Sequence, residues 1–460
     1  MAHKSLIGGT AYEVSGGKTL VSGTVYSIAG GKTQVGGTAY AVEFEEGSST
    51  GGGVPTAMLY SDGSFIFQAG DEVASGKTLT ASYTDFEDIS TPPWNGKQNT
   101  FKSVSFDTVV SPTSIAYWFN NARNMVANLN TFGNLNMGAV TYMSCAYTNC
   151  TNLTGSPVCG DKVTNMYFAY NNCRKLTGSP VCGDNVISMF YAYTNCTNLT
   201  GSPVCGNKVT DMAYAYRNCQ NLTGSPVCGN NVIRMEGAYN NCRKLTGSPV
   251  CGDKVDSLQS TYQNCNNLTG SPVCGNKVTD MAYAYANCNN LTGSPVCGSN
   301  VTNMYYTYQN CTNLTGSPVC GYNVTNMVYT YLNCTNLTGS PVCGYKVTNM
   351  TYAYHNCTNL TGSPVCGNNV INMAYTYYNC RNLNACDMYI YTIKINNACN
   401  CFYGKNNSRR YNIYVPADSS TLNAFLVNNT KSIVGAAIAW TQDGDTYYNT
   451  AYNIYIYATL

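Results

Sequence analysis

The chain carries little charge for its length. Only 10% of its 460 residues are Asp, Glu, Lys or Arg, and 24 basic against 22 acidic residues leave a formal net charge of +2. Nucleic-acid binding depends on clustered Lys and Arg that displace counterions from phosphates. The sequence has no strongly basic stretch of this kind, so we expect no nucleic-acid partner.

Long apolar runs are also missing. No segment approaches the roughly 18 consecutive apolar residues that a membrane-spanning helix needs. The first residues, MAHKSLIGGTAYEVSGG, contain no apolar stretch of the length found in a signal peptide. We therefore expect synthesis in a cytosol and no insertion into a membrane.

Histidines and paired carboxylates, the usual groups of hydrolytic and metal sites, are scarce. The sequence has two histidines, His3 and His355, and carboxylates such as Asp211 and Glu236 are scattered through it. A glycosidase needs two carboxylates at a defined separation, and a zinc site needs closely spaced Cys and His. The sequence thus predicts no catalytic residues, no metal and no cofactor, and a protein that is not an enzyme.

What the chain does have is a tandem repeat. The unit V-T-N-M-x-Y-A-Y-x-N-C-x-N-L-T-G-S-P-V-C-G-x-x begins at Val140 and recurs every 23 residues up to Val370. Apolar residues three or four apart in its first part favour helical or 3-10 turns. Alternation in T-G-S-P-V-C-G indicates a short strand, although prolines such as Pro180 cannot donate a ladder hydrogen bond. The period predicts a leucine-rich-repeat-like solenoid with short parallel strands.

The flanking segments differ from the repeat and predict small β-rich parts. A second, 14-residue repeat with Gly-Gly turns covers residues 7–44, and its short strands require an oligomer or a docking surface for stability. Alternating segments begin at Tyr411 and Ala451, around a predicted helix at 419–427. The expected division is an attachment or oligomerisation segment at 1–46, a β-rich leader and cap at 47–111, the solenoid at 112–403 and a β-rich C-terminal cap at 404–460.

Cysteine and leucine form columns along the repeat. The 25 cysteines fall mostly into two columns, and their spacings of nine and fourteen residues do not match a metal clamp. Equivalent cysteines one coil apart have Cβ separations near the coil rise of about 4.8 Å, longer than the roughly 3.5 to 4.5 Å that a disulfide prefers. We therefore expect buried, reduced thiols that pack as small apolar groups. The predicted structural ladder comprises Cys150, Cys173, Cys196, Cys219, Cys242, Leu153, Leu176, Leu199, Leu222 and Leu245.

Tyrosine and asparagine form further columns. The column of Tyr170 and Tyr193 is either core or a surface on which glycans stack. The same two interpretations apply to a second column two positions earlier in the repeat, which includes Tyr191. Asparagines such as Asn149 and Asn172 are expected to be turn or ladder residues. The candidate surface-binding residues are Phe168, Tyr191, Tyr214, Tyr283, Tyr306, Tyr329, Tyr352 and Tyr375.

The stretch Val163-Thr-Asn-Met-Tyr-Phe-Ala-Tyr-Asn-Asn-Cys-Arg-Lys-Leu and its ten relatives resemble the BspA-like leucine-rich repeats of bacterial surface adhesins and of phages that infect Firmicutes. The resemblance covers roughly residues 56–415. It implies a phage virion appendage, a head or tail fibre or decoration protein, whose repeats adhere to a host surface glycan or protein. Its N-terminal segment would bind other virion proteins, and the resemblance to phage fibres implies a homo-oligomer such as a trimer. The alternative is a BspA-like adhesin at the bacterial cell surface.

Overall fold

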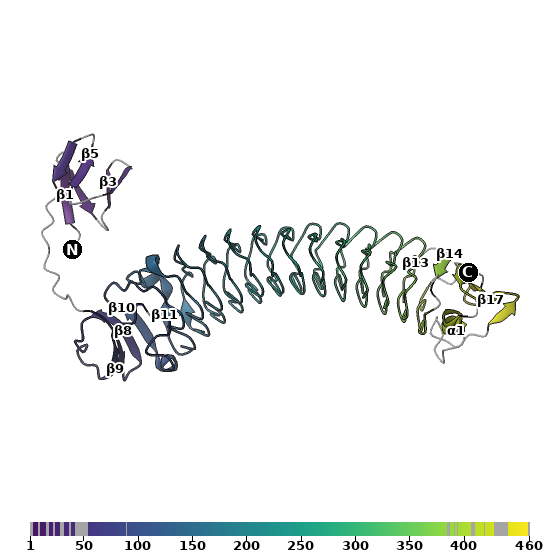
Figure 1. The fold of residues 1–460 in the computed structure, drawn as a ribbon, viewed down its shortest axis with the longest axis horizontal. Helices are drawn as coiled ribbons and strands as arrows, with labels where there is room; N and C mark the ends of the chain where they lie inside the picture. Colours follow the sequence, from purple (N-terminus) through teal and green to yellow (C-terminus); the bar gives the residue numbers. More distant parts are fainter. Residues whose placement is uncertain are drawn as a thin grey trace. The chain divides into compact units, whose positions relative to one another are not determined.

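The computed structural model describes six strands between residues 3 and 41, and residues 54–88, 90–383, 387–390, 392, 394–405, 410–417, 419–426 and 440–458. Two compact units divide the chain, Met1–Val54 and Pro55–Leu460. Figure 1 labels their elements.

The first unit consists of three separate antiparallel hairpins. Each hairpin pairs two strands of four or five residues, which confirms the short strands predicted from the 14-residue repeat. A two-stranded hairpin is marginally stable by itself in water. The oligomeric or attachment role of this segment stays a prediction. The pairs are β1 (His3–Ile7) with β2 (Thr10–Val14), β3 (Lys18–Val21) with β4 (Thr24–Ser27), and β5 (Lys32–Val35) with β6 (Thr38–Ala41).

A four-stranded sheet and an aromatic cluster precede the coils of the second unit. Phe67 of the sheet stacks on Trp118 of the first coil, with ring centroids 5.4 Å apart, and both side chains are fully buried. The indole nitrogen of Trp94 donates to the carbonyl of Trp118 at 2.8 Å. This cluster covers the apolar end of the coils, as a cap must. The strands lie in the order β10 (Ser103–Phe106), β8 (Ser64–Ala69), β7 (Pro55–Tyr60) and β9 (Leu79–Tyr83) across the sheet. Along the chain, the 3-10 helix η1 (Gln98–Thr100) lies between β9 and β10.

The repeats form successive coils that stack in parallel register, one coil per 23 residues. Single-residue parallel bridges link each coil to the next, as from Asn165 to Ser188. Backbone amides in the first part of each coil donate alternately to the following coil and to their own turn. For example, Met166 donates to Ser188 at 2.9 Å, whereas Ala169 donates back to Met166 at 3.0 Å. The coils therefore form a repeat fold, in which each coil depends on its neighbours for hydrogen bonds and for burial of its apolar side chains.

The core of the stack repeats with the sequence. Val163, Met166, Tyr170, Cys173 and Leu176 have no exposed surface, and their equivalents in the other coils are buried in the same way. Four short regular elements lie near the first coils of this region. They are β11 (Ala127–Asn128), η2 (Leu129–Thr131), η3 (Met137–Ala139) and β12 (Leu153–Thr154).

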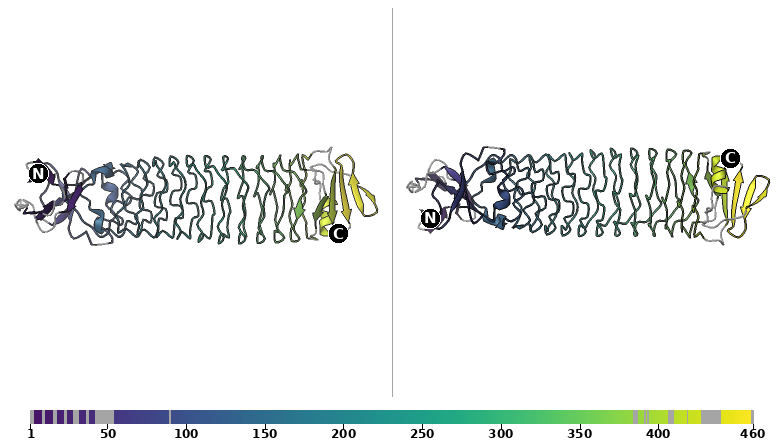
Figure 2. Two further views of the ribbon diagram at one scale, coloured as in Figure 1. Left: turned by 90° about the horizontal axis from the view of Figure 1, so that it is seen from above. Right: turned by 90° about the horizontal axis from the view of Figure 1, so that it is seen from below.

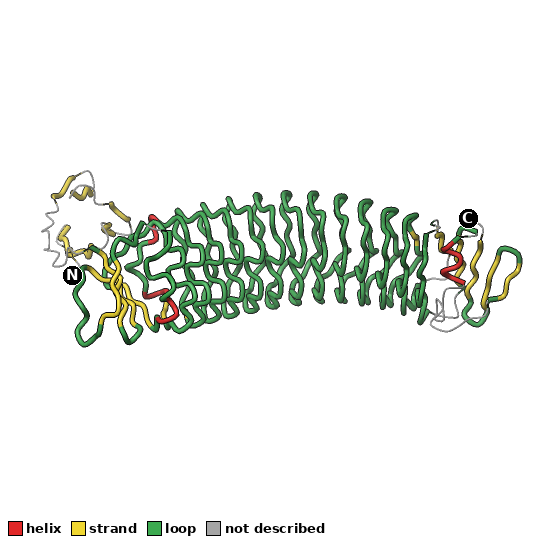
Figure 3. The backbone as a smooth tube through the Cα atoms, turned by 60° about the horizontal axis from the view of Figure 1, so that its bottom comes forward, coloured by secondary structure: helices red, strands yellow, loops and turns green. Residues whose placement is uncertain are grey.

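The predicted strand in T-G-S-P-V-C-G is wrong for nearly all described coils. Only β13 (Val365–Cys366) is a strand at that position, and Figure 3 draws the coils almost wholly as loop. Pro180 has no N–H to give to a ladder. The N–H and C=O of Val181 instead both bond the hydroxyl of Tyr193, at 3.1 and 2.6 Å. In the first part of each repeat, where helical or 3-10 turns were expected, the structure has isolated hydrogen-bonded turns instead of helices.

A six-stranded sheet begins in the last coils and continues toward the C-terminus (Figure 2). Its order is β13-β14-β15-β18-β17-β16, and its first three pairings are parallel. The strands and helix predicted near Tyr411, Ala451 and Ser419 are confirmed, and β14, from the range predicted for the solenoid, also belongs to this sheet. The remaining bounds are β14 (Asp387–Ile390), β15 (Tyr411–Val415), α1 (Ser420–Leu426), β16 (Thr441–Asp443), β17 (Thr446–Asn449) and β18 (Ile454–Ala458).

Candidate binding surface

The predicted surface-binding aromatics all lie where the backbone is left-handed. The φ angle is 54° at Phe168 and 59° at Tyr329, and Ser260 occupies the same position in its coil with φ of 53°. Bulky residues rarely adopt this conformation, so the coil geometry and not residue preference imposes it. The side chains leave the coil at a tight corner and are half-buried.

Five of these aromatics form a continuous stack, the tyrosine strip, which we define as Tyr283, Tyr306, Tyr329, Tyr352 and Tyr375. Neighbouring ring centroids are 4.4 to 5.0 Å apart and the planes are within 16° of parallel. Most ring faces are therefore covered by the next ring. A flat stacking surface for sugars, one of the two interpretations of the column, is wrong for the interior of the strip. A ligand would meet ring edges and hydroxyl groups there.

The column is interrupted after its first three members, Phe168, Tyr191 and Tyr214. Gly237 and Ser260 hold the next two positions, and the ring of Tyr214 leans over Gly237 so closely that a Cβ there would lie 2.5 Å from it. The face of Tyr283 that points toward Ser260 has no partner ring from this column. The sequence shows this gap directly, but not the tilt of Tyr214 that fills half of it.

A second aromatic row lies beside the C-terminal end of the strip. His355 stacks on Tyr352 and on Tyr378, with centroids 5.2 and 4.3 Å apart, and Tyr378 stacks on Tyr403 at 4.6 Å. Burial lowers the pKa of His355 to about 4, so its ring is neutral at pH 7. The two rows together make an aromatic surface that is wider than the single column the sequence suggested.

The column at Tyr170 is core. Its rings stack 5.1 to 5.7 Å apart in near-parallel pairs, and most of their hydroxyls bond the backbone of the returning chain, as from Tyr170 to Val158 at 2.6 Å. This column offers no surface to a ligand. Sequence analysis left this choice open because two tyrosines two positions apart look alike in the repeat.

The predicted structural ladder lies inside the coils. Its thiols donate to backbone carbonyls, as from Cys173 to Tyr147 at 3.0 Å, and burial raises the pKa of Cys173 well above its usual value. Every described cysteine is free, and the second cysteine column is partly buried up to Cys320 and buried at Cys343 and Cys366. These thiols are poor nucleophiles because the thiolate is disfavoured. The ladder residues with no exposed surface are Cys150, Cys173, Cys196, Cys219, Cys242, Leu153, Leu176, Leu199, Leu222 and Leu245.

Asparagine side chains form a hydrogen-bonded ladder on another corner of the coils. Asn195 donates to Asn172 at 2.6 Å and Asn218 donates to Asn195 at 2.7 Å. The ladder breaks once along the described coils: Asn264 makes no such bond to Asn241, whose side-chain oxygen accepts instead from Nε of Arg243 at 2.8 Å. The sequence predicted turn or ladder residues at these positions, and the structure shows a ladder, whose interruption was not predicted.

Two of the acidic side chains within the coils lie beside the same arginine. Arg234 lies 3.1 Å from Asp211 and 3.9 Å from Glu236. Burial raises the pKa of Glu236, and the same arginine opposes that shift. The arginine thus partly neutralises the charge of this cluster.

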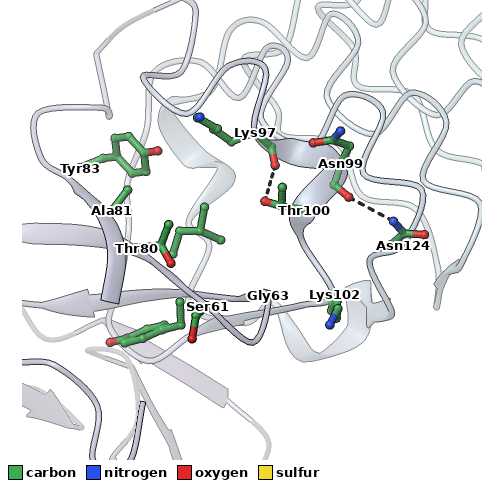
Figure 4. A pocket seen from close by; sticks show the side chains of 12 residues that line it. Ser61, Gly63, Thr80, Ala81, Tyr83, Lys97, Asn99, Thr100, Lys102 and Asn124 are labelled. Carbon is green, nitrogen blue, oxygen red and sulfur yellow. Dashed lines mark hydrogen bonds between the residues drawn. The ribbon is translucent and has the colours of Figure 1, made fainter. Parts of the chain in front are cut away.

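The β-rich leader contains a pocket of about 510 Å³ that sequence analysis missed. Figure 4 shows Tyr83 and Ala81 on one side, facing Lys97 and Asn99. An apolar wall opposite an amino group suits a small molecule with an apolar part and a negative charge. The lining comes from separate stretches of the chain, so no local motif marks it.

No described helix has both the length and the apolarity required to cross a lipid bilayer.

The similarities to known proteins include the repeat region of the chain. A family model described as "Mycoplasma protein of unknown function, DUF285" matches residues 256–363 and 279–413. The chain is similar to a leucine rich cell surface protein from Faecalibacterium prausnitzii, with 15% identity, coverage of 71% of this chain and 91% of that one, and a TM-score of 0.35. It is also similar to a leucine-rich repeat protein from Eubacterium ventriosum, with 16% identity, 72% and 88% coverage, and a TM-score of 0.33. No curated protein matches.

Proposed function

We propose that this chain is a bacterial cell-surface adhesion protein that acts by binding and not by catalysis. The observation that carries the proposal is the tyrosine strip, five half-buried rings held parallel at 4.4 to 5.0 Å. Tyrosine is enriched at protein interfaces because it supplies a large contact area at a low cost in conformational entropy.

The strip is ordered before any ligand binds. Each ring is fixed by its neighbours and by a left-handed backbone position, so little freedom remains to be lost on binding. The side chains one position earlier vary from coil to coil, from Tyr305 to Val328 to Thr351, which suits a specific partner. The partner we propose is a surface macromolecule, glycan or protein, that contacts tyrosine edges and hydroxyls.

The cell surface replaces the virion as the proposed location. The matched family is described from Mycoplasma and both similar structures come from bacteria, so the comparisons contain no link to a phage. The repeat's resemblance to adhesins supports the same location.

The experiment is to locate the full chain in the organism that encodes it. Antibodies against the purified protein would label intact cells, and protease added outside would remove the label. Labelling only after lysis, or recovery of the protein with phage particles, would overturn the proposed location. Binding of the purified chain to arrayed surface glycans and proteins then identifies the partner, and the absence of any bound class would count against adhesion.

A further inference from the structure

Two regular features of the coils are interrupted at the same place. The tyrosine column lacks a ring at Gly237 and Ser260, and the asparagine ladder is broken between Asn241 and Asn264. Both interruptions fall in the two coils that begin at Val232 and Val255. This region is therefore chemically distinct from the uniform coils on either side.

A polar groove of about 550 Å³ begins at this interruption. It continues over four coils, a distance of about 14 Å at roughly 4.8 Å per coil. Its lining consists of amides, one hydroxyl and one guanidinium, and it includes no carboxylate. The lining includes the side chains of Arg243, Asn264, Asn266, Asn287, Asn289 and Thr312.

The amides of the groove are held in defined orientations. Asn287 donates to Asn264, and Asn310 donates to Asn287, each at 2.7 Å. Each of these amides keeps one further N–H and one further oxygen lone pair. Asn266 and Asn289, two positions further along their coils, add amides that contact solvent. Such a row of donors and acceptors matches the hydroxyl groups of a sugar chain.

Arg243 supplies the single positive charge of the groove. Its Nε is held by Asn241 at 2.8 Å, which fixes the guanidinium plane and leaves its terminal nitrogens for a ligand. A planar guanidinium binds a carboxylate through two parallel hydrogen bonds. The groove is thus built for a ligand with many hydroxyl groups and a carboxylate.

We propose that this groove binds an acidic oligosaccharide that contains uronic acid, with a carboxylate on Arg243 and hydroxyls on the asparagine amides. The site goes beyond the adhesive role of the tyrosine strip and uses none of its residues.

The test measures binding of tetragalacturonate to the full-length chain by calorimetry, with the fully methyl-esterified tetramer as the neutral comparison. We expect binding of the acid only. Arg243→Ala should weaken it about tenfold or more, because a charged hydrogen-bonded pair is lost. Arg174→Ala is the matched control, because Arg174 has the same Asn-Cys-Arg-Lys-Leu context while the ladder beside it is unbroken.

Equal binding of acid and ester, an unchanged affinity in Arg243→Ala, an equal loss in Arg174→Ala, or no binding of the acid would each overturn the proposal. Tyr329→Ser with Tyr352→Ser should leave tetragalacturonate affinity unchanged. Failure of the strip as an adhesive surface is thereby distinguished from failure of the groove.

Discussion

The hydroxyl of Tyr193 donates a hydrogen bond to the carbonyl of Val181 at 2.6 Å and accepts one from the amide of the same valine at 3.1 Å. The arrangement recurs along the coils, as between Tyr239 and Val227. It satisfies both backbone groups of the valine that follows proline. One side chain thereby replaces the strand pairing that proline prevents.

Removal of one of these hydroxyls should destabilise the coils. Tyr239→Phe leaves the N–H and C=O of Val227 without their partner, and we expect a loss of about 1–3 kcal/mol in unfolding free energy. Urea unfolding followed by circular dichroism measures it. Tyr147→Phe is the control, because the buried hydroxyl of Tyr147 has no partner among the described residues. Equal losses in both variants would contradict this account.

Filling the gap in the tyrosine column should stabilise the protein. Ser260→Tyr places a ring against the free face of Tyr283, and an aromatic pair contributes about 0.5–1.5 kcal/mol. Gly237→Tyr should do the opposite, since a Cβ there would lie 2.5 Å from the ring of Tyr214. Thermal unfolding of the two variants compares them. A lower midpoint for Ser260→Tyr would show that the gap does not accept a ring.

The asparagine ladder should tolerate a carboxylate only at its break. Asn310→Asp cannot donate to Asn287, and its oxygens would face the oxygen of that amide, so we expect a loss of about 1–3 kcal/mol. Asn264→Asp keeps the bond it accepts from Asn287 and loses no ladder bond to Asn241. Urea midpoints for both variants at pH 7 test the difference. Matching losses would mean that the ladder bonds do not govern stability.

His355 should make stability depend on pH. Its folded pKa of about 4 lies below the usual 6.5, because burial disfavours the charged ring. The unfolded chain therefore binds a proton at a higher pH than the folded chain does. The contribution of neutral His355 to the free energy of unfolding is fully present above pH 6.5 and is lost as the pH falls toward 4.

The matched variant for this effect is His355→Gln, since Gln309 holds the equivalent position two coils earlier. We expect its unfolding midpoint to fall less between pH 7 and pH 4.5 than that of the unchanged chain. Parallel decreases in the two proteins would assign the acid sensitivity to other groups.

The repeat length and the core were predictable because Val163, Met166, Cys173 and Leu176 recur at fixed spacing and are apolar. The strand was mispredicted because the partner of Val181 is a tyrosine hydroxyl twelve residues later, and a local pattern cannot show such a pairing.

The groove was missed for a related reason. Arg174 and Arg243 stand in the same five-residue sequence, yet only Arg243 takes the place of a ladder asparagine. The difference depends on the coil that follows each arginine. The sequence of a single repeat therefore could not distinguish Arg243 from Arg174, and the groove becomes visible only when adjacent coils are stacked.

The most direct test of the adhesive account compares the full chain with Tyr329→Ser/Tyr352→Ser in binding to intact target cells. Serine is compatible with the backbone there, because Ser260 already occupies the equivalent left-handed position. Thr315→Ala/Thr338→Ala, on the exposed part of T-G-S-P-V-C-G, is the control. The account predicts a binding loss of about tenfold or more for the tyrosine variant alone, with unchanged circular dichroism. Undiminished binding of that variant would contradict the account.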